Sequence, residues 1–348
     1  MSTPDWQSLV RPNIWHLAPY RSARDEYSGT DAHVFLDANE NPYNRPYNRY
    51  PDPLQRELKQ QVSRVKGVPV GNIFLGNGSD EAIDLIYRVF CRPSKDNVVA
   101  IEPTYGMYSV CAAINDVEYR RVTLEAHFSL RADKLLQACS QNTKAIFICS
   151  PNNPTGNAME RKEMLRLCED FNGIVVIDEA YVDFQREPSI VSELSAHPNL
   201  VVLQTLSKAW GSAAIRLGMA FAHETVIGFF NKVKYPYNVN HLTQEQASEM
   251  LHHIDDVEKW VHLILDERPK VMRAVSELPY CKEVFPTEAN FFLARMTKAD
   301  ALYNYLVERG IVVRNRSRVT LCQDCLRITI GTPAENTALI AALRQWEG

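Results

Sequence analysis

The chain has 348 residues, which is long for a single hydrophobic core, so two domains are expected. Hydrophobic residues make up 45% and charged residues 23%, as in most soluble globular proteins. A formal net charge of -4 argues against nucleic-acid binding, and no apolar stretch is long enough to span a membrane.

The N-terminal segment MSTPDWQSLVRP has neither the charged nor the apolar region of a secretory signal, which predicts a cytoplasmic protein. Residues 1–36 are rich in Arg, Pro, Tyr and Trp without a sustained period, and we expect them to form an arm that lies over other parts of the molecule. Residues 37–53, DANENPYNRPYNRYPDP, are either a surface loop or a functional irregular segment. A helical pattern then runs from residue 54 to about 66 and ends at Gly67.

Between residues 72 and 222, short apolar strands alternate with amphipathic helices. The predicted strands cover 72–75, 97–102, 118–124, 144–149, 173–178, 199–204 and 216–222. Continuous apolar runs in such an alternation predict an α/β fold with a mostly parallel sheet covered by helices on both faces. Ligands of such sheets bind beyond the carboxyl ends of the strands, so the candidate site is expected there.

After residue 223 the pattern becomes helical, with a long run over 257–278. Strand-like segments at 281–286, 290–296, 311–314 and 326–330 then surround helical patterns near 298–309 and 333–346. This order indicates a smaller α+β domain. The expected organisation is an arm (1–36), a large ligand-binding domain (37–250) and a small C-terminal domain (251–348).

The eight cysteines lie mostly in apolar runs, which indicates buried, reduced thiols rather than a disulfide framework. Cys322 and Cys325 form a CxxC pair. Because no second pair or suitably spaced histidines accompany it, a zinc or redox role is disfavoured, and no metal site is predicted.

Lys208 follows a buried strand at 200–203, at the point where Thr205 and Ser207 also leave the sheet. A lysine held away from water tends to lose its proton and becomes a nucleophile for carbonyl groups. The carbonyl compound that proteins most often present to such a lysine is pyridoxal 5'-phosphate. The alternative is a surface lysine in a loop, so the assignment depends on the other strand ends.

A phosphate site is predicted where the strand at 72–75 gives way to GNGSDEAIDLIYRVF. A glycine turn that opens a helix near Ser79 and Asp80 offers free backbone N–H groups and the positive end of a helix dipole, although it is also an ordinary helix start. Ser207 and Arg216 flank the lysine and suit the remaining phosphate oxygens, the arginine through a charge-assisted fork.

Three further strand ends supply groups that this cofactor requires. Asp178 ends the strand at 173–178 and can keep a pyridine nitrogen protonated, while Tyr181 is placed to reach the phenolic oxygen. Asn153, in the turn SPNNPTG, can donate to the same oxygen, and Tyr105, in PTYGMY, can lay its ring on the pyridine. Taken singly, each residue also has an ordinary interpretation as a helix cap, a rigid turn or a core aromatic.

Taken together, these motifs resemble those of the fold type I pyridoxal-phosphate aminotransferases, from about residue 14 to the end of the chain. The matching motifs are Asn153-Pro154-Thr155-Gly156, Asp178 with Tyr181, Ser207-Lys208, Arg216 and the C-terminal arginine strand. The resemblance implies a large domain with a mostly parallel seven-stranded sheet between helices and a smaller C-terminal α+β domain. It also implies that Lys208 forms the Schiff base with the cofactor and moves a substrate proton, that Asp178 pairs with the pyridine nitrogen, and that Arg327 binds the substrate's anionic group.

Within these enzymes the chain is most similar to the histidinol-phosphate aminotransferases. The similar segments are LAPY, DANENP, RYPDP, GNGSDEAIDLIYRVF, EPTYGMY, VVIDEAYVDF, TLSKAWG and the Arg314…Arg327 pair before GTPAEN. The resemblance implies a homodimer in which Tyr50 reaches the partner's cofactor phosphate. It also implies that Tyr20, Arg314 and Arg327, with Asn153, hold a phosphate-monoester substrate.

The sequence departs from this family next to Lys208. Residues 212–215 read Ser-Ala-Ala-Ile where the family more often shows Leu-Ala-Gly-Leu, and Met219 stands where an aromatic residue is common. These changes affect the expected fine specificity rather than the cofactor.

The predicted reaction is amino transfer between L-histidinol phosphate and 2-oxoglutarate, by a ping-pong mechanism, in histidine biosynthesis. One alternative is a pyridoxal-phosphate decarboxylase of a phosphorylated amino acid such as threonine phosphate, which would release carbon dioxide without an amino acceptor. A second is an aromatic or broad-range aminotransferase, for which Arg314 would hardly matter. A sensor that binds the cofactor without turnover is disfavoured, because no DNA-binding or other output module precedes the fold.

Overall fold

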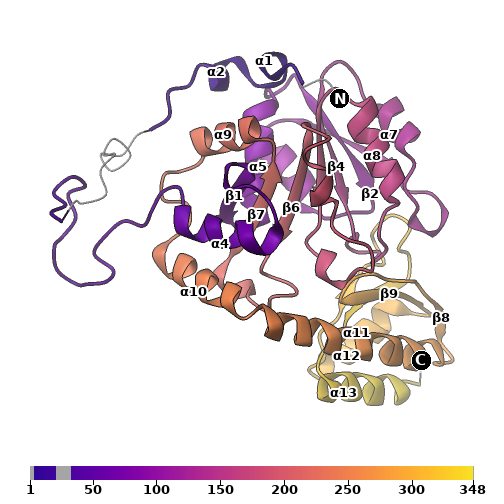
Figure 1. Cartoon of the computed structure of the whole chain (residues 1–348). Helices are drawn as coiled ribbons and strands as arrows, with labels where there is room; N and C mark the ends of the chain where they lie inside the picture. Colours follow the sequence, from indigo (N-terminus) through magenta and orange to yellow (C-terminus); the bar gives the residue numbers. More distant parts are fainter. Residues whose placement is uncertain (1–3, 21–32, 348) are drawn as a thin grey trace.

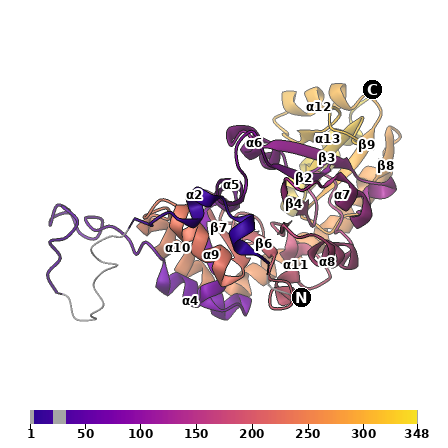
Figure 2. The same cartoon turned by 90° about the horizontal axis from the view of Figure 1, so that it is seen from above.

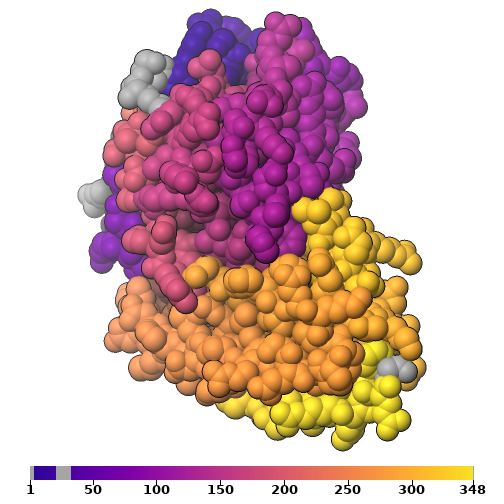
Figure 3. All heavy atoms as spheres, turned by 90° about the vertical axis from the view of Figure 1, so that its right-hand side faces the viewer, coloured from indigo at the N-terminus to yellow at the C-terminus, as the bar shows by residue number. Residues whose placement is uncertain are grey.

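The computed structural model describes residues 4–20 and 33–347, and in these ranges the chain forms a large α/β domain and a smaller α+β domain (Figure 1). Viewed from above in Figure 2, the segment that leads into α4 (Arg56–Lys66) extends away from the body of the protein, on the side opposite the small domain. In the space-filling view of Figure 3 the orange and yellow C-terminal part lies below the magenta part and packs against it.

The large domain is built on a seven-stranded sheet in the order β1-β7-β6-β5-β4-β2-β3. The strands are β1 (Ile73–Asn77), β2 (Asn97–Glu102), β3 (Glu118–Thr123), β4 (Thr143–Cys149), β5 (Ile174–Asp178), β6 (Leu200–Thr205) and β7 (Leu217–Ala222). Only β7 runs against the others, pairing antiparallel with both β1 and β6. The predicted seven-stranded, mostly parallel sheet is confirmed.

The apolar runs of the sequence form the inner strands because both faces of this sheet are buried. Along β4, Ile146 and Ile148 point into one core, while Phe147 and Cys149 point into the core on the opposite face. All four side chains are at most 1% exposed. Side chains alternate along a strand, so a strand covered on both faces needs a continuous apolar run.

Helices cover both faces of the sheet and give a three-layered domain (Figure 1). One face is packed by α1 (Trp6–Leu9), α2 (Pro12–Trp15), α5 (Ser79–Phe90), α6 (Met107–Ile114) and α9 (Glu224–Val233). The other face is packed by α4, α7 (Ala132–Ala138), α8 (Arg161–Asp170), α10 (His241–His252) and the first part of α11 (Ile254–Ser276). Short 3₁₀ helices lie at Val70–Asn72, Ala126–Phe128, Val182–Phe184, Ile190–Glu193 and Ala213–Ile215.

The small domain has an antiparallel four-stranded sheet in the order β10-β11-β9-β8. Its elements are β8 (Cys281–Val284), β9 (Phe291–Met296), α12 (Ala299–Glu308), β10 (Arg314–Asn315), β11 (Cys325–Thr329) and α13 (Pro333–Arg344). The predicted strand at 311–314 is wrong for its first three residues. Ile311 N–H instead donates to Leu306 O at the end of α12, and Val312 is 79% exposed, so only Arg314 reaches the sheet.

Helix α11 connects the two domains. Val257 and Val261, in its first half, pack in the large-domain core, whereas Val271 and Val275 belong to the core of the small domain. Pro269 lies inside the helix between the two pairs. The predicted boundaries at residues 36 and 250 remain predictions.

The topology brings the site residues to one edge of the large sheet. Strands β1, β2, β4, β5 and β6 all end at this edge because they run in the same direction. Strand β7 runs the other way and therefore begins there, with Gly218 opposite both Gly76 and Thr205. Arg216, just before β7, thus reaches the edge where the other strands end.

Candidate active site

A cavity of about 810 Å³ lies at this edge, between the large sheet and the small domain. All predicted site residues except Tyr20 and Tyr50 line it, namely Ser79, Asp80, Tyr105, Asn153, Asp178, Tyr181, Thr205, Ser207, Lys208, Arg216, Arg314 and Arg327. The cavity therefore unites residues from seven separate segments of the chain. For the residues of the large domain, this convergence follows from strand direction, as the sequence pattern predicted.

The N-terminus of α5 forms one end of the cavity. Gly78 occupies the N-cap position with φ +76°, and no side chain caps the helix there. The first N–H groups of the helix, at Ser79 and Asp80, therefore point outward at the positive end of the helix dipole. The turn at Gly78 and the N–H groups of Ser79 and Asp80 form a phosphate cup, in which a phosphate can bind without further donors.

Close backbone packing fixes the position of this cup. A Cβ atom on Gly218 would lie 2.0 Å from the backbone nitrogen of Ser79 and 2.1 Å from the carbonyl carbon of Gly78. Gly78 N–H also donates to the carbonyl of Arg216 at 2.6 Å. Strand β7 therefore holds the start of α5 in place, and glycine is required where the two backbones meet.

Two side chains from the Lys208 segment complete the cup. Arg216 Nη1 lies 3.4 Å from Ser207 Oγ, and Arg216 Nη2 lies 3.9 Å from the Asp80 carboxylate. Thr205 Oγ1 accepts a hydrogen bond from Ser207 N–H at 3.1 Å, which orients the serine. A guanidinium, a hydroxyl and helix N–H groups together make a site for a compact anion.

Asp178 ends β5 inside the protein and is only 2% exposed. The Tyr108 hydroxyl donates to its Oδ2 at 2.7 Å, and Ala180 N–H donates to its Oδ1 at 3.1 Å. Burial raises the pKa of Asp178 to about 6, although both hydrogen bonds and the charge of Lys208 oppose the rise. A buried carboxylate of this kind is stabilised by a cationic partner such as a protonated ring nitrogen.

The sequence pattern did not predict Tyr108 as a site residue. It is fully buried on α6, where its ring stacks on Phe147 with centroids 5.1 Å apart. Phe147 also stacks on Tyr87, whose hydroxyl donates to the Tyr108 carbonyl at 2.7 Å. Tyr108 is thus held in an aromatic stack, and its hydroxyl fixes the position of the Asp178 carboxylate.

Lys208 lies beside Tyr181, with its Nζ 5.5 Å from the centre of the tyrosine ring. Although its side chain is reached by solvent through the cavity, burial, Arg327 and Arg216 lower the pKa of Lys208, and Asp178 opposes them. Burial also raises the pKa of Tyr181, so its phenol is neutral at physiological pH. A lysine amine with a lowered pKa is a better nucleophile and proton acceptor than an ordinary lysine.

Tyr105 borders the cavity next to the phosphate cup. Its hydroxyl donates to Asp80 Oδ1 at 3.1 Å, and its ring meets the ring of Tyr108 edge to face, with centroids 5.6 Å apart. The two contacts fix the plane of the Tyr105 ring. A planar group that enters the cavity can stack on it.

Three arginines of the small domain line the opposite end of the cavity. Arg314 on β10 lies directly across from Arg327 on β11, and Arg316 follows just beyond β10. Arg327 Nη1 donates to Asn153 Oδ1 at 2.5 Å, and its guanidinium lies 5.1 Å from the centre of the Phe291 ring. Arg316 was not predicted, because nothing in the sequence RNRSR distinguishes it from its neighbours.

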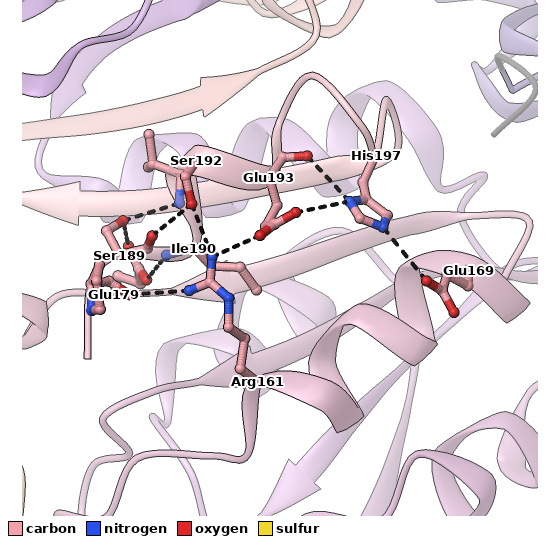
Figure 4. Close-up of polar contacts among 10 residues, drawn as sticks. Arg161, Glu169, Glu179, Ser189, Ile190, Ser192, Glu193 and His197 are labelled. Atoms are coloured by element: carbon pink, nitrogen blue, oxygen red, sulfur yellow. Dashed lines mark hydrogen bonds and ion pairs between the residues drawn. The ribbon is translucent and has the colours of Figure 1, made fainter. Parts of the chain in front are cut away.

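A polar cluster lies directly behind Asp178. The next residue, Glu179, is 3% exposed and accepts hydrogen bonds from the Ser189 hydroxyl and from Ile190 N–H at 2.8 Å (Figure 4). It also accepts a hydrogen bond from Gln204 Nε2 at 3.0 Å. Gln204 belongs to β6, so Glu179 links the end of β5 to the end of β6. The strands that carry Asp178 and the lysine are thereby held together.

The loop that supplies Ser189 is itself fixed to α8. Arg161 Nη2 donates to Ser192 Oγ and to Glu193 Oε1, each at 2.9 Å, and Glu193 also lies near His197 (Figure 4). These contacts support the strand ends from outside the cavity.

Tyr20 and Tyr50 do not line the cavity of their own chain. Tyr20 is 73% exposed, whereas Tyr50 is 50% exposed and stacks on Tyr237 with ring centroids 4.4 Å apart. Their predicted roles in binding therefore stay predictions. Residues 21–32, part of the predicted arm, lie outside the described residues.

The CxxC pair of the sequence does not line the cavity. Cys322 and Cys325 are both free, buried thiols. Within residues 4–20 and 33–347, no group of three or more His, Cys, Asp or Glu side chains is arranged to hold a metal ion. Among the same residues, no helix combines the length and apolar character needed to cross a membrane.

Comparison with known proteins agrees with this geometry. A family model described as aminotransferase class I and II matches residues 23–343. The chain is 61% identical over 341 residues to the histidinol-phosphate aminotransferase of Bacteroides fragilis, covering 98% of this chain and 99% of that protein.

Two solved structures show the same fold. The histidinol-phosphate aminotransferase from Sinorhizobium meliloti, in complex with pyridoxal-5'-phosphate, matches with a TM-score of 0.79 and 23% identity over 85% of this chain and 82% of that chain. The L-threonine-O-3-phosphate decarboxylase from Porphyromonas gingivalis matches with a TM-score of 0.71 and 26% identity over 85% and 90%. The fold is therefore shared by both reaction classes.

Proposed function

This chain belongs to the aminotransferase class I and II family, and we infer that it transfers the amino group between L-histidinol phosphate and 2-oxoglutarate. The products are imidazole-acetol phosphate and L-glutamate, and the reaction belongs to L-histidine biosynthesis. The protein is a pyridoxal-phosphate-dependent transaminase. The observation that carries the substrate assignment is that Arg314 and Arg327 meet in the same cavity as Lys208, because a phosphate ester held there by its anion presents its amino group to the lysine.

Two different parts of the cavity suit the two ends of the cofactor. The uncapped start of α5, with Ser207 and Arg216, suits its phosphate, and Asp178 suits its ring nitrogen. The buried Asp178 carboxylate has a raised pKa and no cationic group in hydrogen-bonding contact among the described residues, so a protonated nitrogen would relieve its burial. When bound, with Lys208 as its covalent anchor, pyridoxal 5'-phosphate supplies an electron sink for the bonds at the substrate α-carbon.

Lys208 performs the proton transfer in this proposal. Its lowered pKa leaves more of the amine neutral at physiological pH, so Nζ can remove a proton from the substrate α-carbon. Net amino transfer requires the same amine to deliver that proton to the cofactor carbon C4′ and not back to the α-carbon. Asp178, held by Tyr108, keeps the ring nitrogen protonated, and Asn153 and Tyr181 bind the phenolic oxygen. Tyr105, whose ring plane is fixed by two contacts, orients the ring.

In this proposal, the part of the cavity lined by Arg314 and Arg327 binds two different substrates in turn. Histidinol phosphate carries a phosphate, and glutamate carries a side-chain carboxylate, so one pocket must accept both anions in turn. Arg314 and Arg327 provide planar donors that match either group. Asn153 holds one side of Arg327, which limits the directions in which that guanidinium can move.

We also propose that the enzyme is a cytoplasmic homodimer in which Tyr50 reaches the cofactor phosphate of the other subunit and Tyr20 helps to cover the substrate. In support, the described part of the arm and the segment 37–53 that follows it expose large apolar side chains, including Leu36 (91%) and Tyr43 (78%), which a second copy can bury. All eight cysteines are free, in keeping with a reducing compartment.

The test uses the purified full chain loaded with pyridoxal 5'-phosphate. One equivalent of L-histidinol phosphate, without any keto acid, is expected to yield one equivalent of imidazole-acetol phosphate, and 2-oxoglutarate added afterwards is expected to yield one equivalent of glutamate. Borohydride reduction and peptide mass spectrometry are expected to locate the cofactor on Lys208. Reaction with phenylalanine alone would favour a broad-range aminotransferase, and carbon dioxide release from threonine phosphate would favour a decarboxylase.

A further inference from the structure

Arg316 contributes a third positive charge to the anion end of the cavity. The proposed function needs only Arg314 and Arg327 there. Arg316 N–H donates to the carbonyl of Cys325 at 2.8 Å, which continues the pairing of β10 with β11 by one step. Because side chains two positions apart in extended chain share a face, Arg314 and Arg316 both line the cavity.

The arginine cluster lacks a counter-charge within the part of the chain that the structure describes. Among residues 4–20 and 33–347, none of the three guanidinium groups forms an ion pair with a carboxylate within 4 Å. The Nε atoms of Arg316 and Arg327 are both buried and without a hydrogen-bond partner in the same ranges. Burial, Arg327 and Arg314 lower the pKa of Arg316 to about 10, so it stays charged at neutral pH.

A buried N–H donor without a partner costs free energy. The Nε atoms of Arg316 and Arg327 therefore add to the cost of burying these guanidinium groups close together. An anion that enters the cavity can accept hydrogen bonds from the parts of the guanidinium groups that line it, and it can offset the mutual repulsion of the arginines. A phosphate monoester suits this task better than a carboxylate, since it has three terminal oxygens and a charge close to -2. With three arginines, each of the three oxygens can have its own charged donor.

We propose that Arg316 is a direct ligand of the substrate's phosphate and makes the cavity favour a phosphate monoester over a carboxylate substrate. This inference rests on the proposed function, which supplies the phosphate-bearing substrate. Arg314 and Arg327 serve both anions, whereas Arg316 acts mainly on the phosphate. Arg316 is therefore a specificity residue and is not needed for the chemistry at the α-carbon.

The test compares Arg316→Gln and Arg316→Lys with Arg318→Gln in the full, cofactor-loaded enzyme. Arg318 is an exposed arginine of the same loop and does not line the cavity, so its substitution makes the same charge change without touching the anion. For Arg316→Gln, KM for L-histidinol phosphate is expected to rise about tenfold, as for the loss of one charge-assisted hydrogen bond, with kcat little changed. KM for L-glutamate in the reverse direction is expected to rise less than about threefold.

Inhibition by small anions gives a second measurement. Inorganic phosphate is expected to inhibit Arg316→Gln about tenfold more weakly than it inhibits the unaltered enzyme, and glutarate nearly as strongly. Arg316→Lys keeps the positive charge but loses the planar guanidinium group that can bind two oxygens. Its inhibition by phosphate is expected to lie between that of the unaltered enzyme and that of Arg316→Gln. Arg318→Gln is expected to match the unaltered enzyme in both assays.

The outcomes separate the inference from the proposed function. If the unaltered enzyme does not convert histidinol phosphate, the proposed function is wrong. If it does, two results refute the specificity role of Arg316. In the first, Arg316→Gln changes KM for histidinol phosphate and KM for glutamate by the same factor, and in the second it changes neither value. A loss of kcat with unchanged KM in Arg316→Gln also contradicts the inference, because it indicates a structural effect on catalysis.

Discussion

Replacing Asp178 with asparagine is expected to stabilise the cofactor-free protein and to lower the activity of the cofactor-loaded enzyme. Asp178 is buried at the end of β5, and burial raises its pKa from the ordinary 3.8 to about 6. The folded state therefore binds this proton more tightly than the unfolded chain does. As pH rises from about 4 to about 6, the unfolded chain loses the proton first, and the folded state becomes less stable.

The size of the effect follows from the two pKa values. Each pKa unit corresponds to about 1.36 kcal/mol, so the ionised Asp178 destabilises the empty protein by about 3 kcal/mol above pH 7. At about pH 4.5 the penalty is only about 1 kcal/mol, because the folded state still holds most of its proton. The amide of the variant carries no charge at either pH. The stabilising effect of Asp178→Asn is therefore expected to be about 2 kcal/mol larger at about pH 7.5 than at about pH 4.5.

The assay is urea unfolding of the cofactor-free full chain at these two pH values, followed by tryptophan fluorescence. Other effects of the amide, such as a changed hydrogen bond with the Tyr108 hydroxyl, are the same at both pH values and cancel in the comparison. Glu308→Gln, which removes an exposed carboxylate on α12, is the control and is expected to show no comparable pH dependence. In the loaded enzyme, Asp178→Asn is expected to lower kcat/KM about a hundredfold or more.

The reasoning would be refuted by a difference between Asp178→Asn and the unaltered protein that is the same at both pH values. That result would mean that ionised Asp178 is adequately solvated or paired in the empty site. A difference that grows toward low pH would reverse the sign and contradict the raised pKa itself.

Three further predictions concern the groups around this carboxylate. Tyr108→Phe removes a hydrogen bond that lowers the pKa of the Asp178 carboxylate. As the pH is lowered, cofactor affinity, measured by fluorescence titration, is therefore expected to start falling at a higher pH than in the unaltered protein. Tyr87→Phe, in the same aromatic stack, should leave that pH unchanged. Gly218→Ala forces a Cβ against the start of α5. In urea unfolding, it is expected to lower the free energy of unfolding by about 3 kcal/mol or more, and it is also expected to weaken cofactor binding. Gly228→Ala, on the exposed surface of a helix, should be neutral or stabilising in the same assay. Lys208→Ala is expected to remove turnover and the covalent cofactor peptide in mass spectrometry, and retained turnover would contradict its role.

Much of the site could be predicted because strand direction determines where a residue emerges. Asp178 and Lys208 each follow an apolar run that could only be an inner strand, so their meeting at one edge followed from the parallel order. The position of Arg216 required one more fact. It shares this edge because β7 runs antiparallel to its neighbours, and an apolar run alone does not reveal the direction of its strand.

Tyr108 and Arg316 were missed for different physical reasons. The contact between Tyr108 and Asp178 joins residues 70 positions apart, and it depends on how α6 is rotated against the sheet. Arg316 and Arg318 are equivalent by residue type, but Arg316 continues the pairing of β10 with β11 and lines the cavity, whereas Arg318 lies in the turn that follows and is exposed. The predicted strand at 311–314 failed similarly, because Ile311 N–H bonds back to the last turn of α12 and Val312 faces solvent, so neither pairs with β11.

The empty site combines features that each oppose folding. Asp178 is a buried acid that no cationic side chain of the described residues contacts through a hydrogen bond, Lys208 is a base with a lowered pKa, and three arginines crowd one end of the cavity. Such features persist where binding compensates for them. In the proposed function, a ring nitrogen that shares its proton with Asp178 offsets the first penalty, a covalent bond to Lys208 removes the second, and an anionic substrate offsets the third. The electrostatic strain of the empty protein therefore becomes affinity for the cofactor and the substrate, and the stability gained on binding should exceed what contact area alone would supply.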